Sequence, residues 1–138
     1  MIRLLLADDH PVVRAGLRAL FTAEPDMEVV GEAATAEEAV RACRSLEVDL
    51  VLMDLQFGSG HQGVDATRAL RSTEPAPHVL ILTNYDTDAD ILGAVEAGAS
   101  GYLLKDAPPT ELIAAVRAAA AGETALAPAV AERLSSRA

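Results

Sequence analysis

Five short apolar runs, each followed by a segment with helix signals, constrain the fold of this chain more than any other feature. The runs cover residues 2–7, 27–33, 49–54, 78–83 and 101–105. Short apolar runs bounded by turn residues indicate strands, and strands that alternate with helices favour a parallel sheet with both faces covered. We therefore predict an α/β fold, with a doubly wound, five-stranded parallel sheet in a (βα)5 three-layer sandwich.

The segments between the runs begin and end with helix signals. Pro11 suits the first turn of a helix, and Thr35 with Glu38 forms a capping box at the start of another. Gly98 and Gly122 are placed to stop the fourth and fifth helices. Because crossovers between parallel strands are nearly always right-handed, we expect a flavodoxin-like strand order.

The composition excludes several classes of protein. The 138 residues suit one domain, and hydrophobic residues make up 51% of them while aromatic residues make up 3%, which predicts an aliphatic core. Charges interrupt every apolar run well before the roughly 20 residues that a membrane span needs. A single cysteine, Cys43, cannot form an internal disulfide, so we expect a cytoplasmic protein with no membrane contact. A net charge of −10 disfavours nucleic-acid binding by this chain alone and suits a cation.

Chemically active side chains stand where the predicted strands end. The first run leads into Asp8 and Asp9, the third ends in Asp54, the fourth in Thr83 and the fifth in Lys105. Each residue alone has a plain structural explanation, as a helix cap, a turn residue, a strand residue or a solvated charge. The carboxyl ends of parallel strands meet at one edge of the sheet, where ligands bind. The five residues together therefore predict a functional site at that edge.

The chemistry of such a set is restricted. Crowded carboxylates repel one another unless a cation or protons neutralise them, and oxygen ligands favour a hard cation such as Mg²⁺. A carboxylate can also attack phosphorus and form an aspartyl phosphate. That transfer needs neutralisation of the phosphoryl oxygens by a metal, an ammonium group or a hydroxyl donor. The residues therefore predict Mg²⁺-assisted phosphoryl transfer to an aspartate.

The sequence GSGHQG, residues 58–63, also matches the pattern G-x-G-x-x-G. A dinucleotide-binding fingerprint needs its first glycine at the strand-to-helix turn and an acidic residue at the end of the next strand. Here Asp54 precedes the first glycine, and the next strand ends in Thr83 and Asn84. We therefore reject the dinucleotide interpretation and expect the glycines to let the loop bend around Asp54.

Four stretches carry a family resemblance: LLLADDHPVVRAGL, VDLVLMDLQF, ILTNYDT and GASGYLLKDAPPTEL. Together they resemble the receiver domain of two-component response regulators, of the NarL/FixJ type, over residues 2–122. The resemblance implies a signalling domain that is not an enzyme in its own right. It implies a sensor histidine kinase as the partner and a phosphohistidine as the phosphoryl donor.

The resemblance also implies a role for each matching residue at the metal site. Asp54 corresponds to the phosphoacceptor. Asp9 and Asp54 correspond to Mg²⁺ ligands, together with the main-chain carbonyl of Gln56 and, often through water, Asp8. His10 is expected to lie at the start of a helix, with contact to this site as the minor alternative. The loop departs from the family pattern, with Gly58 where receivers usually have proline, so the lifetime of the phosphoryl group does not carry over.

The remaining implied roles concern the switch. Thr83 corresponds to the hydroxyl that binds the phosphoryl group, and Lys105 pairs with the same group. Tyr102 corresponds to the switch aromatic, whose ring is expected to turn from exposed to buried on activation. The apolar excess of the last helix predicts a homodimer on phosphorylation, with Ala115 and Ala118 near the outer side.

Two alternatives and the domain organisation complete the expectations. A pseudo-receiver would bind partners without phosphorylation, and a haloacid-dehalogenase-like hydrolase would use Mg²⁺ and an aspartyl phosphate on small phosphoesters. We expect residues 1–122 to form the receiver and residues 123–138 a linker toward an output domain absent from these residues. The resemblance implies that this output domain is a LuxR-type helix-turn-helix, through which alone the protein would bind DNA and control transcription.

Overall fold

A parallel sheet with helices on both faces forms the protein. The computed structural model describes residues 1–54, 62–83, 88–123 and 125–126. In chain order the elements are β1 (Ile2–Ala7), α1 (Pro11–Thr22), β2 (Met27–Ala33), α2 (Ala36–Ser45), β3 (Leu50–Met53), α3 (Gln62–Arg71), β4 (His78–Thr83), α4 (Asp88–Glu96), β5 (Gly101–Leu104), α5 (Pro109–Ala120) and β6 (Ala125–Leu126). The strands pair in parallel in the order β2-β1-β3-β4-β5-β6.

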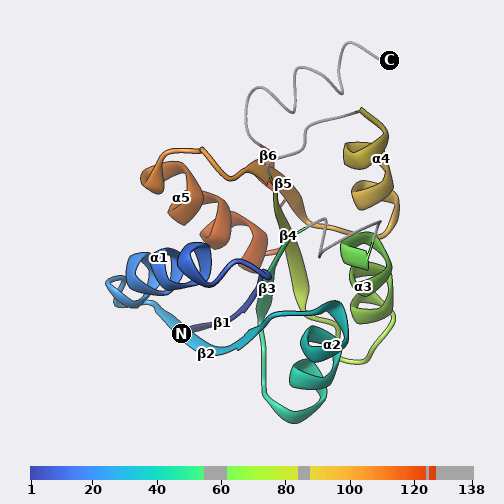
Figure 1. The fold of residues 1–138 in the computed structure, drawn as a ribbon, viewed down its shortest axis with the longest axis horizontal. Coiled ribbons are helices and arrows are strands. Elements are labelled where there is room, and N and C mark those ends of the chain that lie inside the picture. Colours follow the sequence, from blue (N-terminus) through green and yellow to red (C-terminus); the bar gives the residue numbers. More distant parts are fainter. Residues whose placement is uncertain (55–61, 84–87, 124, 127–138) are drawn as a thin grey trace.

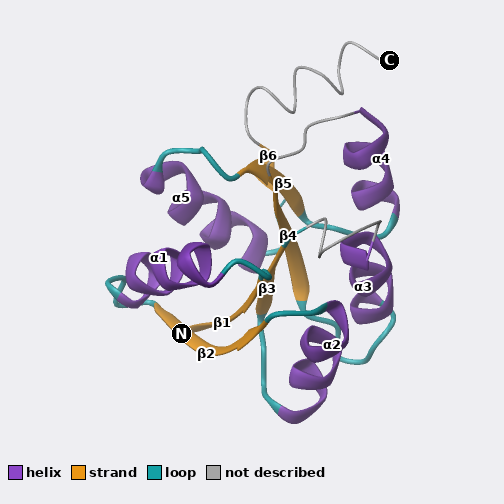
Figure 2. Cartoon of the chain, viewed as in Figure 1, coloured by secondary structure: helices purple, strands orange, loops and turns teal. Residues whose placement is uncertain are grey.

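Two helical layers enclose the sheet (Figures 1 and 2). Helices α1 and α5 cover one face, and α2, α3 and α4 cover the other. The first five strands have the order 2-1-3-4-5, which is the flavodoxin-like order. The predicted α/β class, the parallel sheet and the three-layer sandwich are therefore confirmed.

The core is aliphatic because both faces of the sheet are covered. All four residues of β3 are buried, as expected of a central strand in a parallel sheet. Phe21 and Tyr102 are the largest side chains among those that are fully buried, and the other large ones are leucine, isoleucine and methionine. A rigid central sheet of this kind positions whatever residues follow its strands.

The predicted helix boundaries rest on local hydrogen bonds. The hydroxyl of Thr35 accepts from the N–H of Glu38 at 3.1 Å, and the carboxylate of Glu38 accepts from the N–H of Ala34 at 2.6 Å. Gly98 ends α4 with φ of 103°, and Gly122 ends α5 with φ of 83°. A side chain is strained at such positive φ values, so glycine is the residue that suits both helix ends.

A short sixth strand extends the predicted five-stranded sheet. Ala125 and Leu126 pair in parallel with Gly101 and Tyr102 at the edge of β5. Residues 123–138 are predicted to form a linker, and Ala125 and Leu126 near its start pair with β5. Two residues are too few to form a recognisable apolar pattern, so the sequence alone does not predict this strand.

The prediction for the outer side of α5 was wrong at Ala115. This residue is 8% exposed and belongs to the core, whereas its neighbour Ala114 is exposed. Ala118 is half-buried against the core. Helix α5 packs against β3, β4, β5 and β6, so a wider arc of its surface is covered than one stripe of residues would need.

Introducing a charge on α5 should therefore change stability by very different amounts at two adjacent positions. Ala115→Glu places a larger, unpaired carboxylate in the core, and we expect it to lower the free energy of unfolding by about 3 kcal/mol. Ala114→Glu keeps its carboxylate in water and should change stability by less than about 0.5 kcal/mol. Urea unfolding followed by circular dichroism measures both. Equal stability of the two variants would contradict the burial of Ala115.

Candidate functional site

The strand register brings two of the predicted carboxylates together. Ala7 at the end of β1 pairs with Met53 at the end of β3, so Asp8 and Asp54 follow from neighbouring positions at the same edge. The N–H of Asp54 donates to the carbonyl of Ala7 at 2.8 Å and fixes this arrangement. The two carboxylates are therefore placed by the sheet itself.

The ammonium group of Lys105, which follows β5, bridges these two carboxylates. Its Nζ lies 2.7 Å from Oδ2 of Asp8 and 3.2 Å from Oδ2 of Asp54. Asp8 and Asp54 are each 4% exposed, and the Lys105 side chain is 9% exposed. Burial lowers the pKa of Lys105, but the hydrogen bond with Asp8 and the charges of Asp54 and Asp8 outweigh it and raise the pKa above its ordinary value. Lys105 is therefore a permanent cation at neutral pH.

His10 joins the site, which was the minor alternative to its place at the start of a helix. It does precede α1, but its side chain makes no capping hydrogen bond. Instead Nδ1 lies 3.0 Å from Oδ1 of Asp8 and 3.0 Å from Oδ1 of Asp9. The main-chain N–H of His10 also donates to Oδ1 of Asp8 at 2.7 Å. The adjacency of His10 to the two aspartates was the only sequence signal, and adjacency does not reveal the direction of a side chain.

Arg14 is a second residue that sequence reasoning missed. Its Nη1 donates to the main-chain carbonyl of Asp8 at 2.6 Å, and its Nε lies 3.1 Å from Oε1 of Glu32 on β2. This side chain ties the first turns of α1 to the strand edge that carries Asp8. Its position one helical turn after His10 was the available signal.

The donor set fits a magnesium ion. One ligand atom from each of Asp8, Asp9, His10 and Asp54 lies within 4.8 Å of the others. Three of the four are carboxylate oxygens, the donors that a hard cation prefers, and one or two carboxylates with waters suffice for Mg²⁺. The fourth predicted ligand, the carbonyl of Gln56, lies outside the described residues.

The two predicted switch residues stand on neighbouring strands. Thr83 ends β4, where its main chain pairs with Leu104 of β5, while its side chain is outside the described part. Tyr102 lies on β5 beside Ile81 of β4, and it is fully buried. The ring of Tyr102 therefore already occupies the inward position that was expected only after activation.

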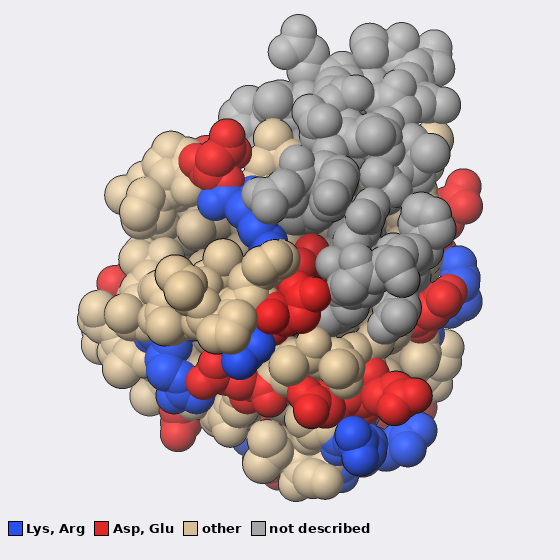
Figure 3. Space-filling model, in the orientation of Figure 1, with Lys and Arg blue, Asp and Glu red and all other residues tan. Residues whose placement is uncertain are grey.

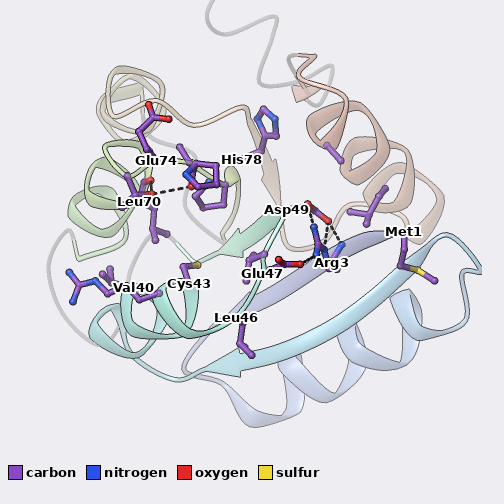
Figure 4. A pocket seen from close by; sticks show the side chains of 18 residues that line it. Met1, Arg3, Val40, Cys43, Leu46, Glu47, Asp49, Leu70, Glu74 and His78 are labelled. Carbon is purple, nitrogen blue, oxygen red and sulfur yellow. Dashed lines mark hydrogen bonds and ion pairs between the residues drawn. The ribbon is translucent and has the colours of Figure 1, made fainter.

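A cavity of about 840 Å³ lies at the opposite edge of the sheet and is separate from this site (Figure 4). Its lining includes Arg3, whose guanidinium pairs with Asp49 at 3.0 Å and with Glu47. Cys43 also lines it, and burial raises the pKa of this thiol to about 11. A thiol that stays protonated at neutral pH is a weak nucleophile, so Cys43 acts as a small packing residue.

Acidic partners neutralise many basic side chains on the surface. On the face shown in Figure 3, blue basic groups lie next to red acidic ones. Arg14 and Arg18 both pair with Glu32, and Arg117 pairs with Asp26. Weak nucleic-acid binding by this chain alone, expected from its net charge of −10, stays a prediction. None of the helices among the described residues is long and apolar enough to cross a membrane.

Comparison with known proteins identifies the family. The sequence model of the response regulator receiver domain matches residues 4–117. The chain belongs to this family. The receiver domain is 42% identical to the transcriptional regulatory protein LiaR of Bacillus subtilis over 137 residues, which cover 99% of this chain and 64% of LiaR. It is 38% identical to the nitrate/nitrite response regulator protein NarL of Escherichia coli over 123 residues, 89% of this chain and 56% of NarL.

A solved structure supports the same assignment. The two-component response regulator of the LuxR family from Aurantimonas sp. SI85-9A1 has a TM-score of 0.91 and 43% identity, covering 98% of this chain and 96% of that one. The chain is therefore a receiver domain of the NarL/LuxR type, as the sequence resemblance implied. It spans 64% of the length of LiaR and 56% of the length of NarL.

Proposed function

We propose that Asp54 of this receiver domain accepts a phosphoryl group from a sensor histidine kinase. The observation that carries the proposal is the buried contact of Lys105 with Asp8 and Asp54, beside Asp9, at the carboxyl edge of the sheet. The carboxylate can act as the nucleophile, and the ammonium group fixed beside it can neutralise charge on the incoming phosphoryl group. In this proposal Asp8, Asp9, Asp54 and the carbonyl of Gln56 hold Mg²⁺.

The transfer moves one phosphoryl group between two proteins. A carboxylate oxygen of Asp54 forms the new O–P bond as the P–N bond of the kinase phosphohistidine breaks, and the departing imidazole keeps the electron pair. When bound, Mg²⁺ supplies positive charge to the phosphoryl oxygens. Lys105 supplies further positive charge from the protein, because its Nζ is already 3.2 Å from the accepting carboxylate. No general base is needed, because the nucleophile is a carboxylate that already pairs with the ammonium group of Lys105.

The output of the domain follows from added charge at Asp54. A phosphoryl group there gives Lys105 a new partner and, in this proposal, draws the hydroxyl of Thr83 toward it. Tyr102 lies on the strand next to β4, so its buried ring is placed to respond to a movement of Thr83. Local charge would then bias a two-state element, as in other phosphorylation switches.

The two alternatives from the sequence analysis have weaker support. A pseudo-receiver typically lacks an acidic residue or the lysine of the site, whereas this chain has all of them. A haloacid-dehalogenase-like hydrolase typically has an aspartate two residues after its nucleophile, whereas this chain has Gln56. The receiver function is therefore the best supported of the three.

Transcription control belongs to the whole protein in this proposal. The relatives LiaR and NarL are named as regulators, and this chain spans about half to two thirds of their length. We infer that a DNA-binding domain outside these residues delivers the output in the cytoplasm and that phosphorylation promotes a homodimer. The isologous two-fold contact is the usual geometry of such a dimer.

The function can be tested by intact-mass spectrometry after incubation with acetyl phosphate. With Mg²⁺ present, we expect the mass of the chain to increase by one phosphoryl group. With EDTA in place of Mg²⁺, we expect no increase. Absence of the adduct under both conditions would favour the pseudo-receiver, and continuous hydrolysis of small phosphoesters would favour the hydrolase.

A further inference from the structure

His10 gives the acidic site a nitrogen donor that an all-carboxylate site lacks. Its Nδ1 lies between the two aspartates that precede it, 3.0 Å from an oxygen of Asp8 and 3.0 Å from an oxygen of Asp9. A ligand atom of His10 lies within 4.8 Å of ligand atoms of Asp8, Asp9 and Asp54, which is close enough for all four to share one ion. The imidazole therefore stands at the position of a metal ligand.

We propose that His10 is a metal-selecting residue, which coordinates first-row transition metal ions through Nδ1 and makes the site discriminate among divalent cations. The inference rests on the proposed Mg²⁺ site. Mg²⁺ prefers oxygen donors and keeps much of its water, so it gains little from an imidazole. Imidazole nitrogen suits ions such as Ni²⁺ and Zn²⁺, and affinity at such sites increases from Mn²⁺ through Co²⁺ to Ni²⁺.

Coordination through Nδ1 requires the ring hydrogen of His10 to move from Nδ1 to Nε2. Nδ1 faces carboxylate oxygens, which only accept hydrogen bonds, so a hydrogen on Nδ1 suits this geometry. Coordination requires the lone pair of Nδ1 and therefore places the hydrogen on Nε2. The His10 side chain is 60% exposed, so water can take up one proton and return the other.

The main chain restricts the movement that coordination needs. The N–H of His10 donates to Oδ1 of Asp8 at 2.7 Å, and Arg14 holds the carbonyl of Asp8 at 2.6 Å. Pro11 begins α1 directly after His10, which fixes the start of the helix. Rotation about the side-chain bonds of His10, together with the shift of its ring hydrogen to Nε2, then directs the lone pair of Nδ1 at a shared ion.

The test compares the affinities of Mg²⁺, Mn²⁺, Co²⁺ and Ni²⁺ for wild type and for His10→Asn by isothermal titration calorimetry. For Mg²⁺, the affinities of wild type and His10→Asn should agree within about twofold. The wild-type advantage should increase along the series to at least about tenfold for Ni²⁺. The Co²⁺ complex should also show a visible absorption band that shifts in His10→Asn. The matched control is His78→Asn, because His78 begins β4 at the opposite edge and its Nδ1 lies 3.3 Å from Ser100. This control should leave every affinity unchanged.

Two results would overturn the inference. One is an affinity ratio that is the same for all four ions, which would mean that His10 only bridges the aspartates by hydrogen bonds. The other is an unchanged Co²⁺ spectrum in His10→Asn. Failure of the proposed function looks different, since Asp54 would then remain unphosphorylated in Mg²⁺ whatever the order of metal affinities.

Discussion

Asp54→Asn is expected to abolish the phosphoryl adduct that acetyl phosphate and Mg²⁺ produce in the wild type. The amide has the shape of the carboxylate, so the buried position, which is 4% exposed, keeps its packing. A neutral amide oxygen is a poor nucleophile and a poor partner for Mg²⁺. The loss should be complete in the intact-mass spectrum, and circular dichroism should show a folded variant.

The matched control is another aspartate close in the chain to the site. Asp106 follows Lys105 and is exposed, so Asp106→Asn changes net charge by the same amount without touching the buried carboxylates. This control should retain the full adduct. An adduct of undiminished intensity in Asp54→Asn would show that another residue accepts the phosphoryl group.

Removing the ammonium group should produce the largest loss of stability at the site. Lys105→Met keeps the length of the side chain but leaves Asp8 and Asp54 buried with one positive charge fewer. Breaking a buried charge pair from one side typically costs about 3 to 5 kcal/mol, and we expect a loss of about 3 kcal/mol in EDTA. Urea unfolding measures it. Mg²⁺ should reduce the loss, because a cation that binds only the folded state stabilises that state.

The pH dependence of this loss has a definite sign. The folded state raises the pKa of Lys105 above 10.5, so the stabilisation is fully present below pH 10.5 and is lost as the pH rises through the folded-state value. The difference between wild type and Lys105→Met should therefore be the same at pH 7 and pH 9. Adding Asp8→Asn to Lys105→Met should recover part of the loss, because the carboxylate 2.7 Å from Nζ is then neutral. Unfolding of Lys105→Met at the wild-type urea midpoint in EDTA would contradict the buried pair.

The architecture and the residues that follow the strands could be predicted, because both depend on short-range patterns. Apolar runs of four to seven residues identify strands, and Gly98 and Gly122 end helices for a steric reason that is local to each residue. Parallel pairing then places residues after different strands at one edge. Asp8, Asp54 and Lys105 could be assigned in this way without any knowledge of side-chain directions.

The parts that could not be predicted depend on long-range packing. Ala115 is in the core because α5 lies over several strands, and the helix sequence alone does not reveal how many strands it covers. The pairing of Ala125 and Leu126 with β5 depends on a free sheet edge. The direction of the His10 side chain depends on the contacts of its Nδ1 with Asp8 and Asp9, which the sequence does not show.

Lys105 is the only lysine of the chain, and the other basic side chains that carry a permanent charge are arginines. The ion pair at the site therefore contains the only side-chain amine available for acylation, and its competitor is the amino terminus. An amine held between Asp8 and Asp54 is protonated and shielded, so it reacts slowly. A ligand bound to Asp8 or Asp54 should therefore change the rate at which Lys105 is acylated. That rate can be used to follow ligand binding at the site without an added label.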